Sequence, residues 1–162
     1  MTGKLKTQKS AEKKAGRYER IYNQLVDLLQ KPGNEISRMA TVVAVLSHKM
    51  DNFFWTGFYL LDNGELYAGP YQGPVACQLL KKNTGVCWEA TNLETTIVVP
   101  NVHLFPGHIA CDSRSNSEIA LPLRNTEGKV IGVLDVDSTE LESFDQIDKE
   151  WLEKIVSLLI TP

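Results

Sequence analysis

The chain changes its hydrophobic period near residue 50, and this change constrains the fold more than any other feature. Apolar residues recur at three- and four-residue spacing before that point and again near the end. This spacing predicts helices over about 10–31, 35–50 and 144–159, with a further short helix over 85–92. Between them lie short runs rich in β-branched and aromatic residues. These runs predict strands over about 54–61, 65–70, 76–80, 96–99, 117–123 and 129–136.

Two tight turns join neighbouring strands of this series. Asp62-Asn63-Gly64 separates one predicted pair, and residues 125–128, with sequence NTEG, separate another. Turns of this kind favour hairpins and therefore antiparallel pairing. We predict an α+β fold, an antiparallel sheet with helices packed mainly on one side.

Charge is spread unevenly along the 162 residues, which hold 17 basic and 20 acidic side chains. Residues 1–20 carry seven Lys or Arg and two Glu, so the remainder is strongly acidic and nucleic acid is not expected as a partner. We expect a frayed basic segment over 1–14 and one domain over 15–160. There is no apolar run long enough for a membrane span and no signal-peptide pattern at the start, so we expect a cytoplasmic protein.

Three cysteines, Cys77, Cys87 and Cys111, are the first candidates for chemistry. An odd number without a signal peptide does not suggest a disulfide framework, which leaves buried core residues, a metal site or reactive thiols. No C-x2-C pair is present, so we expect no metal site. Cys111 lies in the aperiodic segment 102–116, and long irregular loops are often functional.

Positively charged neighbours would favour the thiolate of Cys111. Arg114, His103 and His108 lie close to it in sequence, and positive charge lowers a thiol pKa. An ordinary loop cysteine without special reactivity is the alternative.

Acidic residues alternate with apolar ones in the strand predicted over 129–136 and just beyond it. Asp135 and Asp137 share one face, whereas Leu134 and Val136 share the other, which suits the core. Glu118 opens the partner strand and could join the two aspartates. Clustered carboxyls raise one another's pKa and can hold a shared proton. A solvated strand end is the alternative.

Two aromatic residues four positions apart, Trp55 and Tyr59, also lie on one face of a predicted strand. They could form the wall of a pocket. Packing within the core is the alternative.

Three motifs carry a resemblance to a known family. They are FPGHIACD at residues 105–112, SEI at 117–119 and GVLDVD at 132–137. With these motifs, and with its three cysteines in matching order and spacing, the chain resembles the free methionine-(R)-sulfoxide reductases, which are single-domain GAF enzymes. The resemblance covers about residues 15–160. The patterns W-x-G-F-Y from residue 55 and G-x3-C from residue 73 also fit.

The resemblance implies a thiol reaction on free L-methionine (R)-sulfoxide. Cys111 would be the nucleophile and would become a sulfenic acid as methionine leaves. Cys77 would be the main resolving thiol and Cys87 a secondary one, and each could form a disulfide with Cys111. Thioredoxin would restore the thiols, and no cofactor is implied. A homodimer through the N-terminal helices is expected by the same resemblance.

The resemblance also implies how the substrate is held. Trp55 and Tyr59 would contact the thioether, while Glu118 could pair with the α-ammonium group. A carboxyl of Glu118, Asp135 or Asp137 would protonate the sulfoxide oxygen or donate a hydrogen bond to it. A GAF sensor that binds a small ligand, or senses redox state through Cys111, without turnover is the alternative function.

One position departs from the family pattern. The family has Gly directly after its middle cysteine, whereas Trp88 follows Cys87 here. Because Gly adopts backbone conformations that Trp resists, we expect an altered loop around Cys87.

Overall fold

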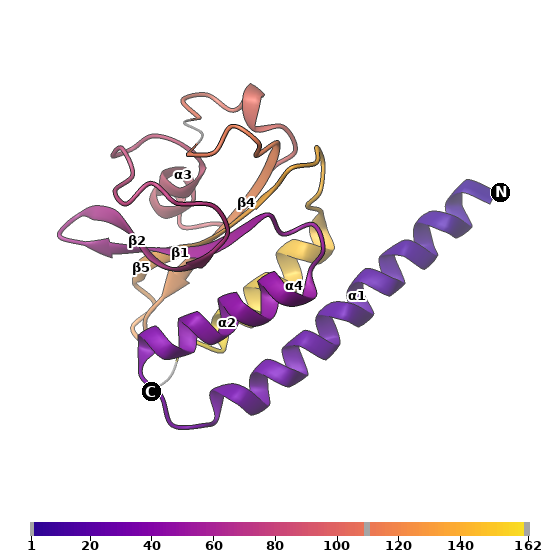
Figure 1. The fold of residues 1–162 in the computed structure, drawn as a ribbon, viewed down its shortest axis with the longest axis horizontal. Coiled ribbons are helices and arrows are strands. Elements are labelled where there is room, and N and C mark those ends of the chain that lie inside the picture. Colours follow the sequence, from indigo (N-terminus) through magenta and orange to yellow (C-terminus); the bar gives the residue numbers. More distant parts are fainter. Residues whose placement is uncertain (1, 109–110, 161–162) are drawn as a thin grey trace.

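The computed structural model describes residues 2–108 and 111–160 and has four helices and a five-stranded sheet in that part of the chain (Figure 1). The strand order is β2-β1-β5-β4-β3 and all neighbours are antiparallel. The α+β prediction is therefore confirmed. The elements are α1 (Thr2–Leu29), α2 (Glu35–Lys49), β1 (Trp55–Asp62), β2 (Glu65–Gln72), α3 (Val86–Leu93), β3 (Ile97–Val99), a 3-10 turn (Val102–Leu104), β4 (Ser117–Arg124), β5 (Val130–Ser138) and α4 (Gln146–Ser157).

Helices α1, α2 and α4 cover one face of the sheet and α3 lies on the other (Figure 1). The three-helix side holds the larger apolar core, because α2 and α4 present buried side chains to the strands and α1 packs its own buried stripe against these two helices. Sheet residues of this core come from alternate positions of β1, β4 and β5. Its fully buried large members include Tyr18, Leu25, Val42, Leu46, Phe58, Ile119, Leu121, Leu134, Leu152 and Ile155. The expectation that helices pack mainly on one side is thus confirmed.

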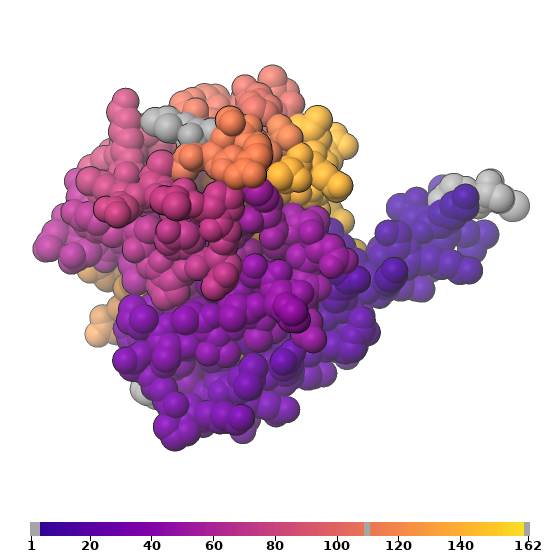
Figure 2. Space-filling model, viewed as in Figure 1, coloured from indigo at the N-terminus to yellow at the C-terminus, as the bar shows by residue number. Residues whose placement is uncertain are grey.

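Helix α1 is longer than its apolar stripe predicts. It begins at Thr2 and includes the basic segment, whose first turns stand clear of the rest of the molecule (Figures 1 and 2). Its second half packs against α2 and α4 through the buried side chains of Tyr18, Ile21 and Leu25. None of the helices in the described part of the chain is both long and apolar enough to cross a membrane.

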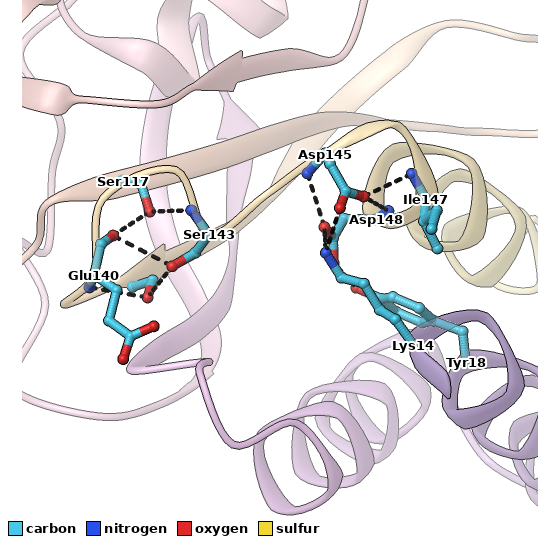
Figure 3. A network of polar contacts seen from close by, with 9 residues as sticks. Lys14, Tyr18, Ser117, Glu140, Ser143, Asp145, Ile147 and Asp148 are labelled. Atoms are coloured by element: carbon cyan, nitrogen blue, oxygen red, sulfur yellow. Dashed lines mark hydrogen bonds and ion pairs between the residues drawn. The ribbon is translucent and has the colours of Figure 1, made fainter. Parts of the chain in front are cut away.

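A polar network fixes α1 to the start of α4 (Figure 3). Lys14 donates to the carboxylates of Asp145 and Asp148, and the Tyr18 hydroxyl donates to Asp148 Oδ1 at 2.7 Å. Asp145 caps α4, and its own N–H donates to Asp148 Oδ2. Every oxygen of the fully buried Asp148 side chain therefore has a partner.

One predicted strand is wrong. Residues 76–80 form only a single bridge, between Tyr67 and Leu79, beside β2. Two backbone hydrogen bonds hold it there, from the N–H of Ala68 to Gln78 and from the N–H of Leu80 to Leu66. The segment cannot extend this pairing because Pro74 lacks an N–H and the chain turns at 81–84. It instead forms one side of a cavity.

Candidate active site

A cavity of about 210 Å³ opens on the α3 face of the sheet. It lies between the strands, the start of α3 and the loops around residues 74–81 and 111–115. All eight residues selected from the sequence line it, although they come from six separate segments. They are Trp55, Tyr59, Cys77, Cys87, Cys111, Glu118, Asp135 and Asp137.

Strand register brings the three carboxyls together. Glu118 of β4 is paired directly with Asp137 of β5, and Asp135 follows two positions along the same face. Leu134 and Val136 pack in the core on the opposite face, as predicted. Burial raises the pKa of all three acids, Asp135 to about 6, and charge from neighbouring carboxyls raises the pKa of Glu118 and Asp137 further. The cluster can therefore hold protons near neutral pH.

Cys87 lies beneath this cluster, at the second position of α3. Its Sγ is 3.9 Å from Glu118 Oε1, close enough for the thiol to donate a weak hydrogen bond. Burial, followed by the charges of the carboxyls, raises the pKa of this thiol well above its ordinary value. Cys87 is thus held as a protonated thiol at neutral pH.

Trp88, the position that departs from the family pattern, lies within α3 and not in a loop. Trp88 is buried in α3 with helical backbone, which places no demand for Gly at that position. A positive φ of +87° occurs at Gly85, directly before the helix. The turn into α3 therefore uses a glycine on the other side of Cys87.

The other two cysteines, Cys77 and Cys111, are joined by a disulfide, with their Cα atoms 5.6 Å apart. The bond crosses the cavity rim between two loops that are 34 residues apart in sequence. Cys111 is exposed and Cys77 is half-buried. Of the three possibilities that the sequence left open, redox-active thiols fit this pair, whereas Cys87 is a buried free thiol.

The residues expected to make the surroundings of Cys111 positive have other partners. Arg114 forms an ion pair with Asp112 and lies over the ring of Phe54. His103 is hydrogen-bonded to Asn116. Because Asp112 and Asn116 belong to the loop that carries Cys111, these contacts stabilise the loop.

His108 enters the site in a different role from the one expected. Its Nδ1 lies 3.8 Å from Glu118 Oε2, and its Nε2 is buried without a hydrogen-bond partner. Burial lowers the pKa of this imidazole, so it is neutral at neutral pH. The sequence marked it only as a charge near Cys111. Its contact with Glu118 depends on how the irregular loop folds back over the sheet.

An aromatic stack forms the wall beside the cluster. The ring of Trp55 stacks between Tyr59, at 5.5 Å, and Tyr71, at 5.3 Å. Trp55 is fixed further because its Nε1–H donates to the Pro74 carbonyl at 3.1 Å. Gly57 makes room for the stack, since a Cβ there would lie 2.3 Å from Tyr71 Cβ. Neither Tyr71 nor the role of Gly57 was predicted from the sequence; a glycine midway between the aromatic residues Trp55 and Tyr59 is the signal that could have indicated the close packing.

Comparison with known proteins assigns this arrangement to a family. The GAF domain family model matches residues 36–159. GAF domain-containing protein A of Dictyostelium discoideum is 50% identical over 147 residues, covering 90% of this chain and 92% of the relative. The free methionine-R-sulfoxide reductase of Escherichia coli is 40% identical over 124 residues, covering 76% of this chain and 74% of the relative. The chain belongs to the free methionine-R-sulfoxide reductase family of GAF domain proteins.

A solved structure from the same free methionine-R-sulfoxide reductase family has the same fold. The enzyme from Neisseria meningitidis, determined in complex with its substrate, superposes with a TM-score of 0.86 at 38% identity and covers 90% of this chain and 87% of its own. Within this family fold, the cavity described above has a disulfide at its rim, carboxyls and a thiol at its base and an aromatic wall.

Proposed function

We propose that this chain reduces free L-methionine (R)-S-oxide to L-methionine. Membership of the family makes it an oxidoreductase. The main support for this substrate is the composition and size of the cavity. A redox-active cysteine pair, buried acids without cationic partners and an aromatic wall meet in about 210 Å³, a volume suited to one amino acid.

The proposed reaction begins with the disulfide reduced. The Cys111 thiolate attacks the sulfoxide sulfur, the oxygen passes to Cys111, and methionine leaves with a sulfenic acid formed on the enzyme. The Cys77 thiol then displaces that oxygen as water and forms the Cys77–Cys111 disulfide. Two electrons have moved from the two thiols to the sulfoxide. Cys87 is assigned only a secondary resolving role, since its raised pKa keeps it protonated.

The carboxyls supply protons and charge in this proposal. Glu118 and Asp137, with pKa values well above the ordinary range, stay protonated and donate to the sulfoxide oxygen. Asp135, with its pKa raised only to about 6, is ionised at neutral pH and pairs with the α-ammonium group. Trp55 and Tyr59 contact the thioether and its methyl group.

Recycling requires a dithiol that can reach the disulfide. Cys111 is exposed at the cavity rim, which supports thioredoxin as the reductant through thiol–disulfide exchange. We place the reaction in the cytoplasm, where thioredoxin keeps thiols reduced. The projecting first turns of α1 support a homodimer in which the N-terminal helices meet (Figure 2).

Consumption of NADPH with thioredoxin and thioredoxin reductase tests the proposal directly. The free (R)-sulfoxide should be reduced and the free (S)-sulfoxide should not. An N-acetylated or protein-bound (R)-sulfoxide lacks the ammonium group, so its kcat/KM should be at least about 10³-fold lower. Comparable activity on oxidised protein, or ligand binding with no turnover as in a sensor, would refute the proposal.

Cysteine variants test the assigned roles. Cys111→Ser should abolish turnover. Cys77→Ser should release about one methionine per chain and then stop or slow, because its sulfenic acid is not resolved. If Cys77→Ser cycles at the wild-type rate while Cys87→Ser does not, the resolving roles are reversed.

A further inference from the structure

Three possible metal-ligand atoms, from one helix and two strands, converge at the base of the cavity. Cys87 Sγ and one carboxylate oxygen each from Glu118 and Asp135 all lie within 4.8 Å of one another. Ligand atoms sit about 2.0–2.3 Å from a shared zinc ion, so small side-chain rotations would bring these three onto one ion. The three residues come from α3, β4 and β5, whose backbones are fixed by the sheet.

The same place contains polar atoms that no protein group satisfies. Asp135 is 5% exposed, lines the cavity and has no hydrogen-bond partner for Oδ1. The neutral His108 leaves Nε2 unpartnered while its Nδ1 faces Glu118. Buried polar atoms are nearly always paired, so these atoms indicate a place that a ligand completes.

The charge of the carboxyls and the types of ligand atom indicate which ligand the site would bind. In the described part of the chain, no Lys or Arg lies within ion-pair distance of Glu118, Asp135 or Asp137. The cluster therefore favours a cation small enough to reach the cavity base. A thiolate with carboxylates and a nearby imidazole suits Zn²⁺, whereas Mg²⁺ and Ca²⁺ prefer oxygen alone.

We propose that Cys87, Glu118 and Asp135 bind one Zn²⁺ ion, which excludes the amino-acid substrate from the cavity. On binding, the Cys87 thiol and the protonated Glu118 carboxyl each release a proton to solvent, and sulfur–zinc and oxygen–zinc bonds form. His108 lies next to this set and can supply a fourth ligand through a ring rotation. The ion is an inhibitor and not a cofactor. Only its effect on substrate rests on the proposed function; binding of the ion does not.

The disulfide form of the protein isolates the site for measurement. Cys77 and Cys111 are bonded to each other there, so Cys87 is the one thiol that can bind metal. Calorimetric titration with Zn²⁺ should give one ion per chain. Titration with Co²⁺ should give a thiolate–metal charge-transfer absorption. Cys87→Ser should abolish that absorption and weaken Zn²⁺ binding by more than about 100-fold, since loss of a mere supporting residue already costs about 10–100-fold.

A second variant and a control keep the result clear. Asp135→Asn retains the thiol and should weaken Zn²⁺ binding by at least about 10-fold. Glu127→Gln removes one exposed carboxylate from the β4–β5 turn and should leave the affinity unchanged. Equal Zn²⁺ affinity of Cys87→Ser and wild type, or no binding by the disulfide form, would overturn the site.

Competition tests the exclusion of substrate. The disulfide form cannot turn over, so saturating free methionine (R)-sulfoxide should weaken Zn²⁺ binding at least about tenfold, whereas the N-acetylated form should not. Unchanged affinity would overturn the exclusion and leave the metal site itself standing. Absence of reductase activity in the wild-type enzyme would refute the proposed function but not the Zn²⁺ titration.

Discussion

Two buried acidic groups lie on opposite faces of the sheet and are treated differently by their surroundings. Asp148, on the three-helix side, receives hydrogen bonds from Lys14, the Tyr18 hydroxyl and the Asp145 backbone (Figure 3). Asp135, on the cavity side, leaves Oδ1 without a partner and faces Glu118 across the strands. Both are at least 95% buried, so burial alone does not distinguish them.

The two acids differ in where their hydrogen-bond partners come from. Asp148 is completed by the fold, and its network locks α1 onto α4. Asp135 is only partly completed by the protein, since its Oδ1 has no partner, which is expected where a ligand is to supply the missing one. A satisfied buried acid therefore indicates structure, and an unsatisfied acid in a cavity indicates a site.

The largest expected effect is on catalysis by Asp135→Asn. The amide keeps the shape of the side chain but cannot carry the charge that pairs with the ammonium group, and kcat/KM should fall about 10²–10⁴-fold. Steady-state kinetics with free methionine (R)-sulfoxide measures this, with circular dichroism as a check on folding. Wild-type kcat/KM in the folded variant would show that the charge of Asp135 has no part in the reaction.

Asp148→Asn should lower the stability of the fold and leave catalysis unchanged. Loss of the charge leaves Lys14 and Tyr18 with a weaker acceptor, so the free energy of unfolding should fall by about 2–4 kcal/mol. Its kcat/KM should stay within about twofold of wild type, because the network lies on the far face of the sheet from the cavity. Urea unfolding of the disulfide form gives the first quantity. A variant as stable as wild type would mean that the contacts of Asp148 do not stabilise the fold.

The pH dependence of stability tests the charge of Asp135, although burial raises the pKa of Asp148 in the same direction. The pKa of Asp135 is raised from 3.8 to about 6 by burial, so between these values the folded state binds more protons than the unfolded state. Its contribution to stability is full below about pH 4 and is lost as pH rises through about 6. Asp135→Asn should match wild type near pH 4 and exceed it by about 1–3 kcal/mol at pH 7.5.

Urea titrations at several pH values with EDTA present measure this difference without metal. A gap that is already present at pH 4 would point to altered packing and not to charge. A variant less stable than wild type at pH 7.5 would mean that the fold, and not a ligand, satisfies Asp135.

Most helices and strands could be predicted from the sequence because the local hydrophobic patterns agree with the fold. Apolar spacing placed the helices, and alternation in 132–137 placed Asp135 and Asp137 opposite Leu134 and Val136. The pairing of Glu118 with Asp137 could not be counted from the Asn125 turn, because an irregularity between Leu123 and Arg124 shifts the β4–β5 register by one residue. Alternation within a strand therefore shows which of its side chains share a face, but the turn alone does not show which residues pair across the strands.

The remaining parts of the site depend on contacts between segments far apart in sequence. The approach of His108 to Glu118 follows from the path of an irregular loop, which has no period to read. The position of Tyr71 follows from its pairing with Gly57 across β1 and β2, where the register shifts. The disulfide joins two loops, and the cysteine spacing alone did not determine which pair forms it.

The smallest expected effect tests whether the aromatic wall belongs with the acids or with the fold. In Gly57→Ala the new Cβ would lie 2.3 Å from Tyr71 Cβ and 2.6 Å from Trp55 Cη2, so the stack must shift. Overpacking of this kind costs about 1–3 kcal/mol of stability. The matched change Gly16→Ala, in α1, places its Cβ 3.5 Å from Arg20 Nη1, an ordinary contact, and should stabilise by about 0.5–1 kcal/mol.

Steady-state kinetics of Gly57→Ala shows whether the displaced aromatic stack contacts the substrate. If the wall positions the thioether, Gly57→Ala raises KM for free methionine (R)-sulfoxide several-fold while kcat changes less, because Cys111 and the carboxyls keep their places on other strands and loops. A fall in kcat with unchanged KM would instead mean that the wall orients the reacting sulfur. A loss of stability with wild-type kinetics would assign Trp55 and Tyr71 to the fold alone, and the unsatisfied acids would then be the part of this face that recognises the substrate.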